Sequence, residues 1–248
     1  MSFENKVVMV TGAGSGIGAA TAIIFAKEGA NVVVLDYNEE TAKQIGEKCK
    51  EFGKKVLVLK TDVSKDEEAK KAFEKTISEF GQLDVLVNNA GIGRTETLFN
   101  YMETCDLILN VNLRSVMLMT SLAIPHLIKT KGSIVNVSSI FSTLNRRGLV
   151  YYNYAVAKAG VNCFTRLTAK DLAPYGVRVN AVRPGPVYTN ILASQGLDTT
   201  FDDFVDTTAL KRCSQPEEIG DLIVYLASEK AKSVTGSIVD IDAGMSLV

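Results

Sequence analysis

Histidine and cysteine are scarce in this chain of 248 residues, and each shortage excludes a class of site. The one histidine, His126, stands between Pro125 and Leu127 near the end of an apolar stretch. A Ser-His-Asp hydrolase or a histidine-ligated metal would have to be built on it, so we expect a structural role for His126 and no metal site. The four cysteines show no C-x-x-C spacing, which argues against a zinc site and against a small disulfide framework. A reducing cytosol fits them best.

The chain also lacks a charge imbalance and a long apolar run. Its 27 Lys and Arg nearly cancel its 28 Asp and Glu, so no global field favours nucleic acid or an anionic membrane. The start has no basic stretch followed by an apolar one, as a secretory signal would. No apolar run reaches the roughly 18 residues of a membrane span. We therefore expect a cytoplasmic protein with neither nucleic acid nor membrane as a partner.

What the chain does have is a regular alternation of short apolar runs and amphipathic helical stretches. Continuous apolar runs indicate strands buried on both faces, and their alternation with helices predicts a parallel sheet with right-handed crossovers. The expected strands are 7–10, 32–35, 56–59, 83–87, 133–137, 177–182 and 237–241. The expected helices run from about 17 to 28, through the forties, and over about 65–80, 103–129, 152–172 and 217–227.

No Pro/Ser-rich linker and no internal repeat interrupts this rhythm. We therefore predict an α/β protein with a Rossmann-type doubly wound parallel sheet of about seven strands, folded as a single domain over residues 1–248. The one long stretch without periodicity, about 188–215, is expected to be a substrate-binding lid rather than a merely mobile surface loop.

A glycine-rich turn follows the first expected strand. The segment Thr11-Gly-Ala-Gly-Ser-Gly-Ile-Gly18 leads directly into a helix, where glycines let the backbone approach a pyrophosphate and the helix N-terminus attracts it. The spacing differs from the simplest G-x-G-x-x-G, because Ile17 is the sixth residue counted from Gly12. Asp36 ends the second strand, where a carboxylate binds an adenosine ribose and repels a 2′-phosphate, so NAD(H) is favoured over NADP(H).

A phenol and an ammonium are spaced four residues apart in Tyr154-Ala-Val-Ala-Lys158, so they share one face of the expected helix. A phenol titrates near pH ~10 and needs a positive charge nearby to exchange protons at neutral pH. Lys158 is placed to supply that charge.

These segments resemble the motifs of the short-chain dehydrogenase/reductase family. Thr11 to Gly18 matches its T-G-x-x-x-G-x-G, Asn88-Asn-Ala-Gly91 its N-N-A-G, and Tyr154 to Lys158 its Y-x-x-x-K. Pro184-Gly185 and Thr189 look like its P-G segment, which flanks the nicotinamide. The matches run in the family's order over nearly the whole chain, and they imply an NAD(P)-binding Rossmann fold.

The resemblance implies a catalytic tetrad. Asn112 is similar to the helix asparagine that holds a water in the proton relay, and Ser139 to the serine that hydrogen-bonds the substrate oxygen, with Ser138 as the alternative. Tyr154 is then the acid/base, and Lys158 binds the nicotinamide ribose and lowers the pKa of the phenol. The cofactor-binding residues implied are Gly12, Ser15, Gly16, Ile17, Gly18, Asp36, Asp62, Val63, Asn89, Ala90, Gly91, Tyr154, Lys158, Pro184, Gly185, Val187 and Thr189.

We therefore expect an oxidoreductase that transfers a hydride between NAD(H) and a secondary alcohol or ketone, with Tyr154 as acid/base. A 3-oxoacyl thioester reductase using NADPH is the main alternative, disfavoured by Asp36. A catalytically silent nucleotide-sensing protein is the alternative outside enzymes, disfavoured by the complete tetrad. The substrate stays open among sugars, polyols, steroids and acyl thioesters.

Two further expectations concern surfaces. Family members are usually dimers or tetramers assembled through two long helices, and the apolar residues of 115–127 and 156–172 fit a homotetramer or homodimer. Arg146 and Arg147 fall in a Ser139-to-Tyr154 spacing slightly longer than the family's commonest. They are expected to form a solvated turn rather than a contact with an anionic substrate.

Overall fold

The computed structural model describes residues 2–143, 151–191 and 200–248. Within these residues a seven-stranded parallel sheet has the order β3-β2-β1-β4-β5-β6-β7. The strands are β1 (Val7–Thr11), β2 (Asn31–Asp36), β3 (Val56–Lys60), β4 (Val85–Asn88), β5 (Ser133–Val137), β6 (Arg178–Pro184) and β7 (Ile238–Ile241). This confirms the predicted Rossmann-type doubly wound sheet of about seven strands.

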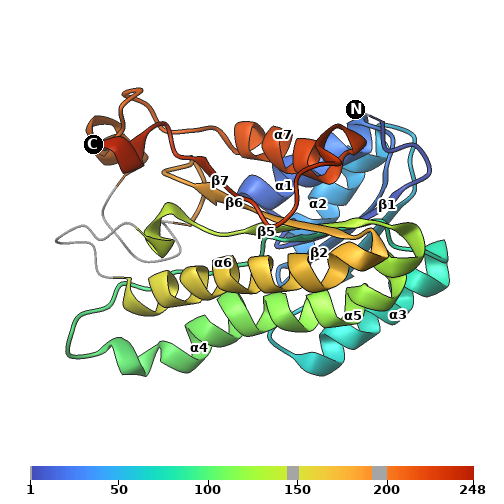
Figure 1. Ribbon diagram of the computed structural model, residues 1–248, viewed down its shortest axis with the longest axis horizontal. Helices are drawn as coiled ribbons and strands as arrows, with labels where there is room; N and C mark the ends of the chain where they lie inside the picture. Colours follow the sequence, from blue (N-terminus) through green and yellow to red (C-terminus); the bar gives the residue numbers. More distant parts are fainter. Residues whose placement is uncertain (1, 144–150, 192–199) are drawn as a thin grey trace.

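Helices cover both faces of the sheet. Figure 1 shows α1, α2 and α7 on one face and α3, α4, α5 and α6 on the other. Their bounds are α1 (Gly16–Lys27), α2 (Glu39–Lys50), α3 (Asp66–Phe80), α4 (Cys105–Leu109), α5 (Ser115–Thr130), α6 (Tyr152–Leu172) and α7 (Pro216–Ala227). The molecule therefore has three layers, with the sheet in the middle.

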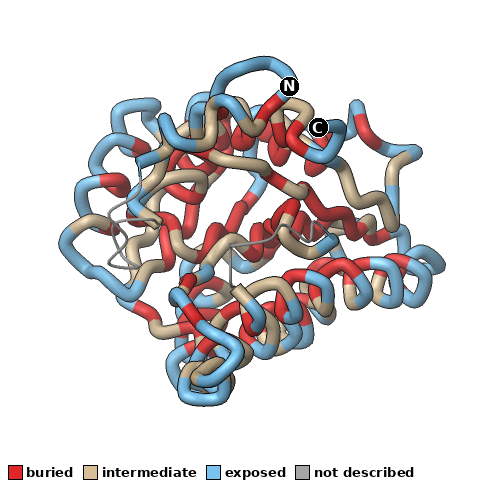
Figure 2. Tube along the Cα trace, turned by 90° about the vertical axis from the view of Figure 1, so that its left-hand side faces the viewer, coloured by how far each residue is buried: buried red, intermediate tan, exposed pale blue. Residues whose placement is uncertain are grey.

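Each face of the sheet contributes to its own apolar core. In β1, Val8 and Val10 point to the face covered by α1 and α7, whereas Val7 and Met9 point to the face covered by α5 and α6. Figure 2 shows the buried trace of the central strands between the two partly exposed helical layers. The continuous apolar runs in the sequence have this physical cause, because a strand buried on both faces has no polar side.

Most expected boundaries lie within two residues of the observed ones, and two segments differ in other ways. The strand predicted over 83–87 runs from Val85 to Asn88, although the Asp84 backbone still donates to the Val7 carbonyl and accepts from the Ser133 N–H. The Asp84 carboxylate also accepts a hydrogen bond from the Val7 backbone and forms an ion pair with Lys6. The stretch 188–215, predicted to be irregular, contains a 3₁₀ helix over Phe201–Thr207. Thr200 and Asp203 close a capping box at its start.

The helix predicted over 103–129 is a composite. A π-helical turn, Asn110–Arg114, joins α4 to α5, so that a continuous helical run extends from Cys105 to Thr130. By length and composition this run is long and apolar enough to cross a membrane, although Asp106, Arg114 and Lys129 interrupt it, so that no uninterrupted apolar run reaches that length. In this fold it is a sheet-covering helix, with Met119 and Leu127 buried in the core.

Candidate active site

The predicted site residues gather at the carboxyl edge of the sheet, around the place where the strand order reverses. The chain passes from β1 to β2 and β3 on one side and then returns to β4 on the other side of β1. Such a switch point leaves a crevice where ligands of doubly wound proteins bind. The glycine turn follows β1, the N-N-A-G segment follows β4, and Ser138-Ser139 follows β5.

The glycine turn is too closely packed for side chains. Gly12 and Gly16 have φ values of +62° and +52°, in the left-handed region that favours glycine. A Cβ on Gly12 would lie 2.8 Å from the Ala90 Cα, and one on Gly18 would lie 2.1 Å from the Gly12 carbonyl oxygen. Gly14, between these two glycines, leaves room for the Asp36 carboxylate, because a Cβ on Gly14 would lie 2.8 Å from the Asp36 Cγ.

Thr11 and Asn89 fasten the glycine turn to the N-N-A-G segment. The Thr11 hydroxyl accepts hydrogen bonds from the backbone N–H groups of Asn89 and Ala90, both at 3.0 Å. The Asn89 amide donates in return to the carbonyls of Thr11 (2.9 Å) and Gly12 (3.0 Å). The role of Thr11 was not predicted from the sequence. The available signal was its fixed place before the first glycine of the motif.

The start of α1 fits the diphosphate of a dinucleotide. Ser15 is the N-cap residue with an extended backbone (φ −156°), and its exposed side chain makes no capping hydrogen bond. The first N–H groups of a helix have no intrahelical partner and carry partial positive charge, so they bind anions. Gly16 faces Thr189, whose Cγ2 lies 3.0 Å from the point where a Cβ on Gly16 would be placed.

Asp36 is fixed beside the same turn. One carboxylate oxygen accepts a hydrogen bond from the Gly14 backbone and the other from the Asn38 backbone, each at 2.8 Å. A carboxylate at this position can accept hydrogen bonds from a ribose and repels an added phosphate. The close-packed glycines, the unbonded helix start and Asp36 together fit a nicotinamide dinucleotide.

The remaining predicted cofactor residues lie on neighbouring loops of the same edge. After β3, Asp62 accepts hydrogen bonds from the backbone and hydroxyl of Ser64, and Val63 is buried. After β6, the Gly185 backbone donates to the Ile241 carbonyl (3.1 Å). Val187 then forms an isolated parallel bridge with Ser214, which closes the base of the segment 188–213.

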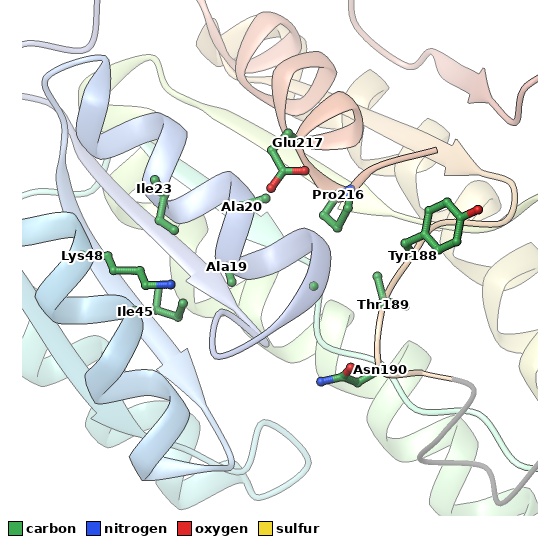
Figure 3. A pocket seen from close by; sticks show the side chains of 11 residues that line it. Ala19, Ala20, Ile23, Ile45, Lys48, Tyr188, Thr189, Asn190, Pro216 and Glu217 are labelled. Atoms are coloured by element: carbon green, nitrogen blue, oxygen red, sulfur yellow. The ribbon is translucent and has the colours of Figure 1, made fainter. Parts of the chain in front are cut away.

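A pocket of about 270 Å³ opens next to Gly16 and Thr189. Figure 3 shows it between α1, α2 and the start of α7, with Ile23, Lys48 and Glu217 along its walls. Its lining includes none of the four predicted tetrad residues. It therefore extends along the outer side of α1, behind the glycine turn, and we do not assign the substrate to it.

Lys158 and Tyr154 share one face of α6, as predicted. The Lys158 ammonium is 5.6 Å from the centre of the Tyr154 ring and donates to the Val137 carbonyl at 2.7 Å. Burial lowers the pKa of Lys158 to about 8. Burial raises the pKa of Tyr154 above its ordinary value of 10, although a hydrogen bond with Ser139 acts in the opposite direction.

The two adjacent serines have different partners. The Ser138 hydroxyl donates to the Lys158 carbonyl (3.1 Å), which ties β5 to α6. The Ser139 hydroxyl accepts from the Phe141 backbone (3.2 Å) and contacts the Tyr154 phenol. Ser139 is therefore the serine beside the phenol, as preferred from the sequence, and Ser138 has a structural contact.

Asn112 is fully buried in the π-helical turn and clamps the backbone after the N-N-A-G segment. Its side-chain oxygen accepts from the Ile92 N–H (2.8 Å), and its amide donates to the Ile92 carbonyl (2.7 Å). A Cβ on Gly91 would lie 3.4 Å from the Asn112 oxygen and 3.5 Å from the Lys158 ammonium. Asn112 and Lys158 thus converge on one point, although 46 positions separate them in the sequence.

Other sequence expectations fall outside this cluster. His126 lies toward the C-terminal end of α5, which leads to the start of β5 at the opposite edge of the sheet, and burial lowers its pKa. Arg146 and Arg147 lie outside the described residues. In the described ranges, no three His, Cys, Asp or Glu side chains are grouped to hold a metal ion.

Comparison with known proteins agrees with this geometry. A family model described as enoyl-(acyl carrier protein) reductase matches residues 12–246. The chain is 38% identical over 247 residues to a 3-oxoacyl-[acyl-carrier-protein] reductase of Thermotoga maritima, covering 99% of both proteins. It is 34% identical to a meso-2,3-butanediol dehydrogenase of Serratia marcescens, covering 98% of this chain and 96% of the relative.

A solved structure of a relative has a closely similar fold. The 3-ketoacyl-(acyl-carrier-protein) reductase of Brucella melitensis, complexed with NADH, superimposes with a TM-score of 0.90 at 34% identity, covering 99% of this chain and 100% of that one. Family match, full-length relatives and fold all agree with the three motifs and their order. The chain therefore belongs to the short-chain dehydrogenase/reductase family and is a nicotinamide-dependent oxidoreductase that acts on CH–OH groups.

Proposed function

We propose that the chain interconverts a secondary alcohol and a ketone with NAD(H), with Asn112, Ser139, Tyr154 and Lys158 as its catalytic tetrad and Tyr154 as the acid/base. The observation that carries this proposal is the convergence of the Asn112 oxygen and the Lys158 ammonium on one point beside Gly91. The Tyr154 phenol stands on the same helical face as Lys158 and contacts Ser139. These groups lie at the same sheet edge as the glycine turn.

When bound, the nicotinamide supplies or accepts the hydride. The side chains then have to place the substrate carbonyl and handle one proton. Because burial raises the pKa of Tyr154, the phenol is protonated at neutral pH and can donate to the substrate oxygen during reduction. The Ser139 hydroxyl, in contact with the phenol, is placed to donate a second hydrogen bond to that oxygen.

In the oxidation direction the phenol has to give up its proton. The Lys158 ammonium favours the phenolate, because opposite charges within several ångströms offset part of the desolvation cost. With a pKa of about 8, Lys158 stays mostly protonated at pH 7. The Asn112 oxygen and the Lys158 ammonium converge beside Gly91, which suits an asparagine that holds a water able to exchange the proton with Lys158.

The first prediction tests the role of Tyr154. Tyr154→Phe removes the exchangeable proton and keeps the ring, so we expect kcat to fall about 10²–10⁴-fold while the Kd of NADH stays close to that of the wild type. Steady-state rates on a panel of ketones and alcohols, with NADH fluorescence titration, measure both quantities. Tyr152→Phe, an exposed residue in the same helical turn, is the control. Full activity in Tyr154→Phe would reject the proposal.

The second prediction concerns the cofactor. Asp36 presents its carboxylate beside Gly14, and the next two residues are Tyr37 and Asn38, with no Lys or Arg to meet a 2′-phosphate. We therefore expect kcat/KM to be at least tenfold higher with NADH than with NADPH. A tenfold preference needs only about 1.4 kcal/mol of repulsion between the Asp36 carboxylate and the 2′-phosphate. Asp36→Asn keeps an acceptor oxygen for the Gly14 N–H but removes the negative charge. It should therefore lower the ratio of kcat/KM with NADH to kcat/KM with NADPH. Preference of the wild type for NADPH would contradict the assignment.

A 3-oxoacyl thioester reductase is the second candidate, because the full-length 38% identity is to a protein of that name. The same kinetic panel separates the two candidates if it contains a 3-oxoacyl thioester beside small ketones and diols. We propose that the segment 188–215 selects the substrate as a lid. Its described part is braced by a hydrogen bond from the Tyr188 hydroxyl to Asp202 (3.0 Å) and by the Tyr188–Phe201 ring contact.

We also propose a cytoplasmic homotetramer or homodimer that binds neither nucleic acid nor membrane. The near-zero net charge argues against nucleic acid and anionic membrane as partners, and the four free cysteines fit a reducing cytoplasm. The exposed apolar side chains Val156 and Leu167 on α6 support self-association.

A further inference from the structure

Glu96 is a buried carboxylate for which the proposed chemistry has no use. It lies in the loop between β4 and the helical run that begins at Cys105, and only 1% of it is exposed. A buried charge is costly unless it is paired or fully hydrogen-bonded. Three donors surround it, namely the Asn153 backbone N–H, the Asn153 side-chain amide and the Thr104 hydroxyl.

The first two donors belong to the residue that precedes Tyr154. The Asn153 N–H donates to one Glu96 oxygen at 3.0 Å, and the Asn153 amide donates to the other at 2.7 Å. The N-cap residue of α6, Tyr151, provides no side-chain cap. Glu96 therefore caps α6 from a distant part of the chain, and its charge interacts favourably with the positive end of this 21-residue helix.

The same side chains fasten a second element to the start of α6. The Asn153 amide also donates to the Tyr101 carbonyl (2.6 Å) and lies 3.2 Å from the Thr104 hydroxyl. The Tyr101 and Tyr152 rings are in contact, with centroids 5.5 Å apart. Glu96 and Asn153 are thus the centre of a buried polar network between the loop 93–104 and the first turn of α6.

We propose that Glu96 is a positioning residue for Tyr154: through Asn153 it fixes the first turn of α6 and so holds the phenol against Ser139. The inference rests on the proposed role of Tyr154. A carboxylate is required because all three neighbours donate, and two oxygens that only accept can satisfy them together. A glutamine has the same shape but turns an NH₂ group toward one of the donors.

The test compares Glu96→Gln with Glu103→Gln, which removes an exposed carboxylate from the same connecting segment. Because small displacements of a reacting group reduce rates strongly, we expect kcat to fall about tenfold or more in Glu96→Gln, with KM and the Kd of NADH within about twofold. The apparent pKa of the basic form in the oxidation pH profile should rise, because the Ser139 hydrogen bond lowers the pKa of the phenol. Glu103→Gln should match the wild type in every readout.

A merely structural role predicts a different pattern. It would lower the melting temperature and the amount of folded enzyme, but the rate per folded molecule and the pH profile would stay those of the wild type, and that result overturns the inference. Asn153→Ala completes a double-mutant cycle with Glu96→Gln, in which we expect the double variant to lose little more than either single variant. Additive losses would also overturn it.

Hydrogen exchange separates failure of this inference from failure of the proposed function. The amides of residues 152–155 should exchange faster in Glu96→Gln than in Glu103→Gln whether or not the reaction is correctly assigned, because the cap is lost in the free protein. If Tyr154→Phe is fully active, the proposed function fails. If Tyr154→Phe is inactive and Glu96→Gln is indistinguishable from the wild type, only the inference fails.

Discussion

Lys158 is a proposed catalytic residue whose burial destabilises the folded chain. The residue is only 3% exposed, and burial lowers its pKa to about 8 from an ordinary value of 10.5. Below pH 8 both the folded and the unfolded chain carry the charge, and the folded chain bears the full desolvation cost of about 3 kcal/mol. As pH rises from about 8 to about 10.5, the unfolded chain holds more protons than the folded one, so this cost is relieved.

Lys158→Met is therefore predicted to unfold less readily than the wild type at pH 7, and its advantage should shrink by about 2 kcal/mol by pH 9.5. Part of the gain at pH 7 is lost because the Val137 carbonyl loses its donor. Urea unfolding at both pH values measures the difference. Lys170→Met, an exposed position on the same helix, should show no such pH dependence. An equal advantage at both pH values would contradict the origin of the pKa shift.

Individual residues differed in how far the sequence could predict them. Tyr154 and Lys158 were recognisable because the two groups are four positions apart on one helix and belong to a motif. Thr11 and Glu96 act through hydrogen bonds to segments 78 and 57 positions away, and nothing in the local sequence encodes such a pairing. The convergence of Asn112 with Lys158 near Gly91 likewise depends on tertiary packing.

At the scale of elements, the strands were predicted well because a strand buried on both faces is apolar throughout. The π-helical turn Asn110–Arg114 was not predicted, since it has no composition of its own and lies inside a continuous helical pattern. Such turns are rare and occur mostly at functional sites. Here the turn contains Asn112, whose side chain makes two hydrogen bonds to the Ile92 backbone and so connects the turn to the segment after β4.

The 3₁₀ helix Phe201–Thr207 was missed for a different reason. Its seven residues are too few for an apolar period to emerge, and their contacts are with the segment after β6. Cys213 donates through its thiol to the Phe201 carbonyl, and Phe201 packs on Tyr188. Elements that are short and depend on partners from elsewhere in the chain leave only a weak pattern in the sequence.

At the scale of the whole molecule, one helical face exposes more apolar surface than a monomer needs. On α6, Val156 (61% exposed) and Leu167 (58% exposed) lie on the outer side, with Ala159 and Cys163 exposed between them. On the neighbouring helix α5, which lies beside α6 in Figure 1, Met117 is also exposed (46%). Contiguous exposed apolar patches commonly mark interfaces, and a symmetric pair of such helices would bury this one.

The last prediction tests this interface. Leu167→Glu puts a charge in the proposed apolar contact, where burying it against the partner would be costly, so we expect dissociation toward a mass of 26.8 kDa. Phe52→Glu adds the same charge at an exposed apolar residue just after α2, on the other face of the sheet, and should leave the assembly intact. Light scattering during size-exclusion chromatography measures both masses. A wild type that elutes as a monomer, or a Leu167→Glu variant that keeps the mass of a multimer, would place the interface elsewhere and leave the outer face of α6 exposed to solvent.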